Sequence, residues 1–598
     1  MTVLPNGHLG NLYFGKRIHD REDFSYLLEM KQRAMTACVY EGNRKFSLEH
    51  LKLEYPVYGS SDYRYPAVEI LQENGSRISE FTYVSHTVTD GKPKLSGLPA
   101  TYTENDEEAQ TLCVKLKDEV TGIVLELLYT IFAQGGIITR SARFTNEGTS
   151  LVHLLNAMSL SLDLPDKDYV WMQFSGAWSR ERHVKERRLE QGIQSVGSIR
   201  GNSSHEHNPF IVLRRPSATE NAGEVMGFSL IYSGNHRMQA EVDTHDTTRI
   251  TVGINPQNFD WKLDCGESFQ TPEAVVVFSD KGLNGMSQTF HKLYQKRLAR
   301  GYWRDRPRPI LNNNWEATYF DFTEDRLVEI AAKAKECGVE LFVLDDGWFG
   351  ARSNDHAGLG DWVANRERLP RGIKGIADRI EEMGMKFGLW IEPEMVNPKS
   401  ELFEKHPDWA ITLPNRKTYY YRNQLVLDLS NPKVQDFVFG VVDNILTENP
   451  EVAYFKWDCN SPITNVYSPY LKNKQGQLYI DHVRGIYNVL KRVKEKYPNT
   501  PMMLCSGGGA RCDYEALKYF TEFWCSDNTD PIERLFIQWG FSQIFPSKAM
   551  SAHVTSWNKK TSVKFRTDVA SMCKLGFDLG LKELNADELT YCQNAVAN

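Results

Sequence analysis

The chain has 598 residues, which is too long for a single hydrophobic core, so we expect two or more domains. Hydrophobic residues make up 41% and charged residues 25%, as in ordinary globular proteins, while aromatic residues reach 12%. The formal net charge of −7 argues against a nucleic-acid partner, and no apolar run approaches the roughly 20 residues that span a bilayer, which argues against a membrane partner.

Residues 1–280 read as β structure, because short alternating or apolar runs recur there between turn segments. We predict strands at residues 112–116, 122–131, 137–145, 224–232, 238–242 and 249–254. Many short strands at this spacing are typical of a large antiparallel β-sandwich. Helical periodicity follows over residues 283–298, so we predict an N-terminal β-sandwich domain at residues 1–280 and a helical linker at residues 281–305.

Beyond Pro307, apolar strands alternate with amphipathic helices. We predict strands at residues 309–313, 341–344, 387–391, 452–457, 502–504 and 523–525. The helices between and after them are predicted at residues 324–337, 376–383, 434–446, 481–496 and 531–539. Repeated β-then-α units of this length indicate a parallel barrel or a doubly wound sheet.

A polar or charged cluster follows each of these predicted strands, beginning near Asn313, Asp345, Glu392, Lys456, Cys505 and Ser526. A TIM barrel draws its active site from the C-terminal ends of many strands, whereas a doubly wound sheet concentrates binding at one switch point. No GxGxxG or Walker A sequence is present to bind a nucleotide. The pattern therefore predicts a catalytic (β/α)8 barrel of the TIM type over residues 306–598.

The ends of the chain and its ten cysteines add weaker expectations. The last predicted helix, residues 587–597, runs to the end without a cap, so we expect a C-terminal domain to be missing. The first residues lack the regions of a signal peptide, which favours the cytoplasm unless a leader was removed. The cysteines form no CxxC pair, so we expect free, mostly buried thiols, no metal site and no cofactor.

Lys456, Asp458 and Asn460 form the most informative pattern. Side chains alternate along a strand, so these three residues point to the same face, which at the strand's end is the pocket. The positive charge of Lys456 favours the ionised form of Asp458, as a nucleophile requires. From spacing alone, the pair could equally be a buried ion pair that only holds the end of the strand.

Asp527 offers a second carboxyl, directly after an aromatic and apolar strand. Apolar surroundings favour the neutral, protonated form of a carboxyl, and a general acid needs that form. Asp530 precedes Pro531 and an apolar run with Glu533, so we assign Asp530 to the N-cap of a helix instead.

Three other features are compatible with a sugar site but have ordinary explanations as well. The glycine-rich segment from Cys505 to Arg511 lets a ligand approach the backbone closely, although it could be only a tight turn. The acidic pair Asp345-Asp346 could supply polar contacts, and Trp315, Trp348 and Trp390 could supply stacking faces. Taken singly, such residues are more often core and ion-pair features.

The chain resembles the large bacterial and fungal α-galactosidases of glycoside hydrolase family 36 over nearly all its length. In the predicted barrel the matching segments begin at Leu344, Trp390, His406, Arg422, Lys456, Cys505 and Ser526, and they include Trp390-Ile391-Glu392-Pro393-Glu394 and Lys456-Trp457-Asp458. In the first half they are Asp62-Tyr63-Arg64, Arg200-Gly201, Ser203-Ser204-His205 and Asn208-Pro209-Phe210.

The resemblance implies a retaining, exo-acting α-galactosidase that removes terminal α-D-galactosyl residues from oligosaccharides such as melibiose and raffinose by double displacement. It implies Asp458 as nucleophile, Asp527 as acid/base, a homotetramer and a C-terminal β domain that this chain lacks. The residues implied to surround galactose are Asp345, Asp346, Trp390, Arg422, Lys456, Asn460, Cys505 and Gly508. Trp315 would lie near the entrance, and Asp62 would reach in from the β domain.

Two departures from the family pattern lie close to the implied site: Ala510 where a fourth glycine is usual, and Cys459 where methionine is usual. Both could shift substrate preference. The main alternative is an α-N-acetylgalactosaminidase of the same family, although the retained Cys505 favours galactose because its segment lies near the sugar's 2-hydroxyl in this family. A catalytically silent carbohydrate-binding protein is the second alternative, and transglycosylation could accompany hydrolysis.

Overall fold

The computed structural model describes residues 1–28, 30, 32–39 and 42–598. Two compact units make up the chain. The first holds Met1–Phe174, Val184–Ile199 and His207–Leu293, and the second holds Ser175–His183, Arg200–Glu206 and Tyr294–Asn598. Two short segments from the first half of the sequence therefore belong to the unit that contains the C-terminal half.

The first unit is built on two antiparallel sheets. One runs in the order β10-β9-β12-β13-β18-β7-β6-β5-β4, with β17 paired to β7. Its strands are β4 (Thr82–Asp90), β5 (Ala109–Lys117), β6 (Ile123–Phe132), β7 (Ile137–Asn146), β9 (Val170–Ser175), β10 (His183–Arg188), β12 (His207–Arg214), β13 (Val225–Ile231), β17 (Ser268–Gln270) and β18 (Glu273–Ser279).

The other sheet runs β11-β14-β15-β8-β16, with β3 paired to β8. Its strands are β3 (Val68–Leu71), β8 (Val152–Leu164), β11 (Gly192–Gly197), β14 (His236–Val242), β15 (Thr248–Ile254) and β16 (Trp261–Leu263). Strands of the two sheets contact each other, as β7 and β18 do with β8. This confirms the predicted sandwich, and the six strands predicted from alternation correspond to β5, β6, β7, β13, β14 and β15.

Position in the sheet explains the composition of individual strands. The central strand β13 is buried along its whole length, so it reads as a continuous apolar run. The edge strand β10 instead carries Lys185, Glu186, Arg187 and Arg188 with exposed side chains. Charges on an edge strand discourage pairing with another chain, because they would be buried by the added strand.

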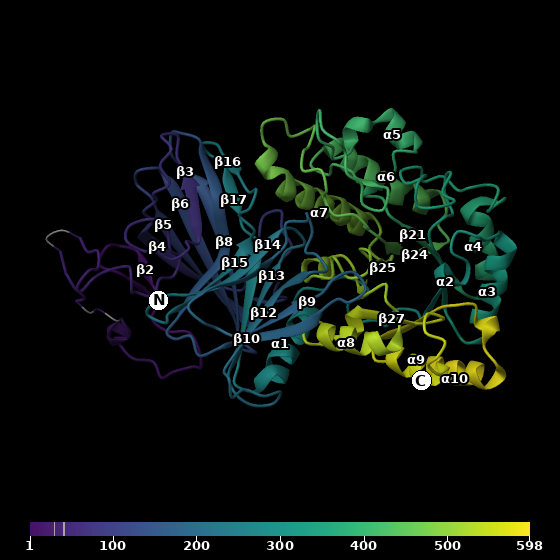
Figure 1. The fold of residues 1–598 in the computed structure, drawn as a ribbon, viewed down its shortest axis with the longest axis horizontal. Helices are drawn as coiled ribbons and strands as arrows, with labels where there is room; N and C mark the ends of the chain where they lie inside the picture. The colour runs from purple at the N-terminus through teal and green to yellow at the C-terminus, as the bar shows by residue number, and fades with distance from the viewer. Residues whose placement is uncertain (29, 31, 40–41) are drawn as a thin grey trace. The chain divides into compact units, whose positions relative to one another are not determined.

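The second unit is a closed barrel of parallel strands in the order β19-β20-β21-β24-β25-β26-β27-β28. The strands are β19 (Leu311–Asn313), β20 (Leu341–Leu344), β21 (Lys386–Ile391), β24 (Val452–Trp457), β25 (Met502–Leu504), β26 (Glu522–Trp524), β27 (Met550–Thr555) and β28 (Lys574–Asp578). The main helices around it are α3 (Glu324–Glu336), α4 (Gly372–Glu382), α6 (Pro432–Glu448), α7 (Leu478–Lys496), α8 (Pro531–Ser542), α9 (Val563–Ala570) and α10 (Ala586–Ala597) (Figure 1).

The predicted barrel is confirmed, including its first six strands, but the sequence did not reveal β27, β28 or α9. Strand β27 contains two serine or threonine residues and a histidine among its six residues, so its apolar pattern is weak. Strand β28 is short, and Gly576 interrupts it. Helix α1 (Gly282–Arg297) matches the predicted linker helix. None of the helices in the described part of the chain combines the length and apolar character needed to cross a membrane.

Apolar side chains fill the interior of the barrel below its polar mouth. The cluster consists of Leu311, Leu341, Val343, Tyr454, Met503, Cys505 and Trp524. Strand β24 links this core to the site, because Tyr454 lies in the cluster while Lys456 and then Asp458 follow on the same face. The alternation of one strand therefore places an apolar layer, a cation and a carboxylate one above the other.

Candidate active site

A cavity of about 640 Å³ opens among the C-terminal ends of the barrel strands. Every barrel strand contributes at least one lining residue, either from the strand itself or from the loop after it. The lining includes Trp315, Asp345, Asp346, Trp390, Arg422, Lys456, Asp458, Asn460, Cys505 and Asp527. These residues, all singled out from the sequence, are thus brought together in one place.

Asp458 lies directly after β24 and is buried. Its Oδ1 accepts hydrogen bonds from the backbone N–H of Cys459 (2.8 Å) and of Gly507 (3.2 Å). Its Oδ2 accepts from the side chains of Asn460 (2.9 Å) and Trp390 (3.2 Å). All four partners are donors, which is the arrangement that suits an ionised carboxylate.

The charge on Asp458 follows from these contacts. Burial alone would raise the pKa of Asp458, but the Lys456 ammonium and the hydrogen bonds from Asn460 and Cys459 outweigh it, so the pKa lies below its usual value. A buried carboxylate that stays ionised near neutral pH and faces a cavity is a good candidate for a nucleophile.

Lys456 is held in place by Asp345. Its Nζ lies 2.8 Å from Oδ2 of Asp345, which also accepts from Asn313 Nδ2 at 2.5 Å. Burial would lower the pKa of Lys456, but the carboxylates of Asp345 and Asp458 raise it, so the ammonium stays charged. The cation therefore bridges two strand ends and supplies positive charge beside Asp458.

Asp346 and Arg422 complete the charged wall. Arg352 binds Asp346 through Nε (2.9 Å) and Nη2 (2.8 Å), a two-point contact that fixes the carboxylate plane. Burial nevertheless raises the pKa of Asp346. Arg422 has a backbone φ of 50°, in the left-handed region, and a strained residue of this kind is commonly found at a functional site.

Glu392 is a buried neighbour that the sequence analysis did not assign to the site. Its Oε1 accepts from Gln424 Nε2 at 2.9 Å and from the backbone N–H of Asn460 at 2.5 Å. Its Oε2 has no hydrogen-bond partner among the described residues. Burial, and then the charge of Asp458, raise the pKa of Glu392 to about 8, so near neutral pH it is protonated next to an ionised carboxylate.

Asp527 follows β26 and has a different environment. The sequence suggested an apolar enclosure, but Asp527 lies three residues beyond the end of the strand at Trp524, and its side chain is only partly buried. Two indole N–H groups bind its carboxyl: Trp524 donates to Oδ1 at 3.0 Å, and Trp178 donates to Oδ2 at 2.9 Å. Asp530, three residues later, caps α8 by accepting from the N–H of Ile532 at 2.9 Å, which confirms its predicted role.

A second pair of carboxyls, Glu316 and Asp578, also lines the cavity. The backbone N–H of Glu316 donates to Asp578 Oδ1 at 2.8 Å, and Thr529 Oγ1 donates to Glu316 Oε1 at 3.1 Å. Burial raises the pKa of Glu316 to about 7. Burial and the neighbouring Glu316 raise the pKa of Asp578 well above its usual value. Glu316 thus disfavours the charged form of Asp578, and a protonated carboxyl can donate a hydrogen bond to a ligand as well as accept one.

The glycine-rich segment meets the segment Arg200–Glu206. His205 Nε2 lies 2.6 Å from the carbonyl oxygen of Gly507, and since a carbonyl only accepts, Nε2 carries the hydrogen. Ser203 Oγ donates to Asp513 at 2.8 Å. Gly508 does not line the cavity itself. Its φ is 78°, and a Cβ there would lie 2.9 Å from the backbone nitrogen of Asp527, so glycine permits this close approach.

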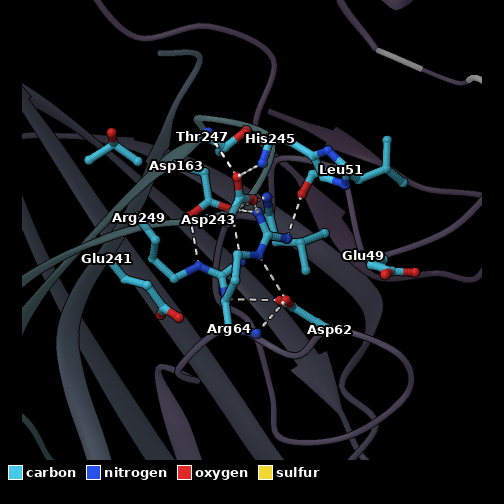
Figure 2. A network of polar contacts seen from close by, with 12 residues as sticks. Glu49, Leu51, Asp62, Arg64, Asp163, Glu241, Asp243, His245, Thr247 and Arg249 are labelled. Carbon is cyan, nitrogen blue, oxygen red and sulfur yellow. Dashed lines mark hydrogen bonds and ion pairs between the residues drawn. The ribbon is translucent and has the colours of Figure 1, made fainter. Parts of the chain in front are cut away.

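Asp62 belongs to the first unit and lies in a buried ion network rather than among the residues that line the cavity. Its Oδ1 is 2.8 Å from Arg64 Nε, and its Oδ2 is 2.9 Å from Arg249 Nη1 (Figure 2). Asp163 also binds Arg249, at 2.8 Å. In this structure Asp62 is thus an ion-pair partner within its own unit.

Several lining residues escaped the sequence analysis as site residues: Trp178, His205, Glu316, Tyr319, Tyr421, Gly507, Trp524, Trp557 and Asp578. The position after a strand could have identified Glu316, which was visible in the first polar cluster. Asp578 follows a strand that the sequence did not reveal. No local signal connects Trp178 to the barrel, because it lies far from the barrel in sequence.

Comparison with known proteins gives a consistent result over the whole chain. Residues 7–264 match the family described as glycosyl hydrolase family 36 N-terminal domain, and residues 268–598 match the family described as melibiase. Alpha-galactosidase AgaA of Geobacillus stearothermophilus is 46% identical over 603 residues, covering 100% of this chain and 82% of AgaA. Alpha-galactosidase Mel36A of Lactobacillus acidophilus is 41% identical, covering 98% of this chain and 81% of Mel36A.

Solved structures agree with the sequence relatives. The crystal structure of AgaA superimposes with a TM-score of 0.98 and covers 100% of this chain, which spans 84% of that structure. A variant of AgaA in complex with raffinose also gives a TM-score of 0.98, at 46% identity and with the same coverage of both chains. Another variant in complex with stachyose gives 0.97, again at 46% identity and the same coverage.

Proposed function

The chain belongs to glycoside hydrolase family 36, and on that premise we propose that it is a retaining α-galactosidase with Asp458 as nucleophile and Asp527 as acid/base. The observation that carries the assignment is the environment of Asp458. Asp458 is buried and accepts hydrogen bonds from four donors, and the nearby Lys456 lowers its pKa, so its carboxyl is ionised. This carboxylate lines a cavity of about 640 Å³. Asp527 lines the same cavity and is the partner carboxyl that double displacement requires.

The reaction proceeds in two displacements. In the first, the carboxyl of Asp527 gives its proton to the glycosidic oxygen as the bond from that oxygen to the anomeric carbon breaks. Asp458 forms a bond to the anomeric carbon from the opposite face. In the second, water attacks that carbon, Asp527 takes the proton of the water, and the bond to Asp458 breaks. Two inversions return α-galactose.

The proposed substrates are oligosaccharides that end in an α-D-galactosyl residue, such as melibiose and raffinose. The relatives bound to raffinose and stachyose support this class. The residues proposed to contact the galactosyl ring surround the nucleophile in one cavity: Asp345, Asp346, Trp390, Arg422, Lys456, Asn460 and Cys505. Trp315 is proposed to lie at the entrance of the site, while Gly508 is proposed to act through the backbone approach that it permits.

The direct test compares an aryl α-galactoside with the matching aryl α-N-acetylgalactosaminide and follows the anomer first released by NMR. We expect turnover of the galactoside with α-galactose as the first product. Preference for the acetamido sugar would instead support the related α-N-acetylgalactosaminidase, and release of β-galactose would exclude the double displacement. Failure to turn over either substrate would favour a silent carbohydrate-binding protein.

Assembly and location are further proposals. From the family resemblance we propose a homotetramer, and light scattering of the purified protein tests the mass. From the same resemblance we propose that Asp62, in the β domain, serves the substrate site. All ten cysteines are free in the structure, which supports a reducing compartment such as the cytoplasm. We also propose a division into a β domain at residues 1–280, a linker at 281–305 and a catalytic barrel at 306–598, with the segments Ser175–His183 and Arg200–Glu206 serving the barrel.

A further inference from the structure

The segment Ser175–His183 is the connection between β9 and β10, yet it belongs to the unit that contains the barrel. Its central turn closes on itself, because Ala177 and Arg180 exchange backbone hydrogen bonds of 3.3 and 3.1 Å. Gly176 is required for this closure, since a Cβ there would lie 2.1 Å from the carbonyl oxygen of Arg180. The turn presents Trp178 to the cavity.

Neighbouring residues fix the turn to the barrel. Asn528, next to Asp527 in the chain, donates from Nδ2 to the carbonyl oxygen of Ser179 at 2.9 Å. Arg182 is fully buried, with Nη2 donating to the carbonyl oxygens of Cys512 (2.8 Å) and Gly509 (3.2 Å). The segment thus joins the loops that follow β25 and β26.

The burial of Arg182 is costly. Its Nε and Nη1 have no hydrogen-bond partner among the described residues, and a buried guanidinium with unsatisfied donors lowers the stability of the fold. Burial also raises the pKa of the adjacent Glu181 to about 7. Because burying Arg182 lowers stability, we infer that the segment Ser175–His183 is kept for a functional group that it places in the cavity rather than for a contribution to stability.

The functional group that the segment places there is the indole N–H of Trp178. Each oxygen of the Asp527 carboxyl accepts one indole hydrogen bond: Oδ1 from Trp524 and Oδ2 from Trp178. The two tryptophans differ in burial: Trp524 is 5% exposed and part of the barrel core, whereas Trp178 is 56% exposed and lines the cavity. Trp524 therefore has a packing role as well, while for Trp178 the contact with Asp527 is the main polar interaction that the structure provides.

We propose that Trp178 is a positioning residue for the acid/base step and a wall of the region that receives the leaving group. Its N–H fixes the plane of the Asp527 carboxyl, so that the proton is aimed at the glycosidic oxygen. Its exposed ring face lies beside that carboxyl, where the departing sugar must pass. This inference rests on the proposed role of Asp527.

The proposal predicts a dependence on the leaving group. A sugar is a poor leaving group and needs its proton in the transition state, whereas an acidic phenol departs without one. Loss of the Trp178 N–H should therefore lower kcat/KM for substrates with a sugar leaving group and leave kcat/KM nearly unchanged for those with an acidic phenol. A merely structural role would lower the rate for all leaving groups alike.

The test measures kcat/KM of the full chain on melibiose and on a series of aryl α-galactosides that ends in 2,4-dinitrophenyl. Trp178→Phe keeps a ring but removes the N–H. We expect kcat/KM for melibiose to fall about 10- to 100-fold, mainly through kcat. The Asp527 carboxyl becomes ionised as its proton leaves, so the variant lacks a hydrogen bond to a group that becomes charged in the transition state. For the dinitrophenyl substrate we expect a change within about 3-fold, inside the range expected of a neutral change.

Trp303→Phe is the matched control, because its indole N–H donates to the carbonyl oxygen of Asn499 at 2.7 Å, outside the cavity. It should leave the whole series unchanged. Trp178→Ala should add a rise in KM for melibiose, since the ring face is also lost.

Equal losses across the series in Trp178→Phe, or no loss on melibiose, would overturn the inference. Asp527→Ala, measured on the same substrates, separates this failure from that of the proposed function. If Asp527→Ala shows the leaving-group dependence and Trp178→Phe does not, only the role of Trp178 is wrong. If neither variant shows it, the acid/base assignment itself is wrong.

Discussion

The two sides of the cavity hold their carboxyls in different ways. Asp458 is enclosed by the barrel's own strand ends, with donors on both oxygens and Lys456 nearby. Asp527 is partly exposed, and one of its two indole partners comes from a segment that precedes the barrel by more than a hundred residues. A carboxylate that must stay ionised can be fixed by burial and charge, whereas one that must exchange a proton keeps access to solvent and is held by orientation.

The largest effect is expected on the enclosed side. Asp458→Ala removes the proposed nucleophile, so no glycosyl-enzyme can form, and kcat on every α-galactoside should fall by about 10⁴-fold or more. Steady-state assays with an aryl substrate and with melibiose measure this. Asp436→Ala, an exposed aspartate on α6, is the control and should retain full activity. Residual turnover near the level of the control would place the nucleophile elsewhere.

A smaller and selective effect is expected on the open side. Asp527→Ala should lower turnover of melibiose by about 10²- to 10⁴-fold, the usual contribution of a general acid/base. A dinitrophenyl galactoside should still react in the first step, so stopped-flow traces should show a burst of phenol followed by a slow steady rate. Azide needs no base, so it should accelerate the second step and yield an α-linked azide.

A β-linked azide from Asp527→Ala would contradict this assignment, because it would mean that the first displacement had been bypassed. The complementary measurement is azide rescue of Asp458→Ala. There the azide would attack the substrate directly, so the product should be β-linked.

The effect of the Lys456 charge on Asp458 can be tested separately from the role of Asp458 as nucleophile. Lys456 lowers the pKa of Asp458, so Lys456→Met should raise that pKa, and the nucleophile will then be ionised only at higher pH. The acidic limb of the kcat/KM profile should move upward by about 1–3 pH units, the usual effect of one adjacent charge. Lys491→Met, an exposed lysine, should leave the profile in place. If Lys456→Met instead lowered kcat/KM by the same factor at every pH, Lys456 would act by contacting the substrate and not by lowering the pKa of Asp458.

The sequence predicted the enclosed side better than the open side, for a physical reason. Strand alternation is local, so the placement of Lys456, Asp458 and Asn460 on one face could be derived from their spacing. The polar clusters after successive strands likewise follow from barrel geometry, which depends on the order of elements rather than on distant contacts.

Features that depend on distant segments could not be derived. The hydrogen bond from Trp178 to Asp527 joins residues 349 positions apart, and the contact of His205 with Gly507 joins residues 302 apart. The family resemblance marked the segment of His205 as informative without a reason, and its contact with the glycine-rich segment supplies one. The raised pKa values of Glu316 and Asp578 could not be predicted from the sequence either, because they arise from burial of two residues that lie at the ends of different strands.

The smallest expected effect concerns two carboxyls on the enclosed side, Asp458 and Glu392. Both are buried, but the pKa of Asp458 is lowered while that of Glu392 is raised. The pKa of Glu392 is raised from 4.5 to about 8, so the folded protein holds its proton more tightly than the unfolded chain does. Stability from this group is fully present below about pH 4.5 and is lost as pH rises toward 8.

Glutamine imitates the protonated form and does not titrate. Glu392→Gln should therefore nearly match the parent near pH 5 and be more stable than it near pH 8. The gain should be at most about 5 kcal/mol, since the pKa rises from 4.5 to about 8 and one pKa unit corresponds to about 1.4 kcal/mol. Calorimetry should show this as a Tm raised by a few degrees at the higher pH only. Glu394→Gln is the contrasting variant, because Glu394 is paired with Arg511 at 2.8 Å and its loss should destabilise at both pH values. If Glu392→Gln destabilised the protein equally at both pH values, Glu392 would have to be ionised in the folded state, and the raised pKa would be wrong.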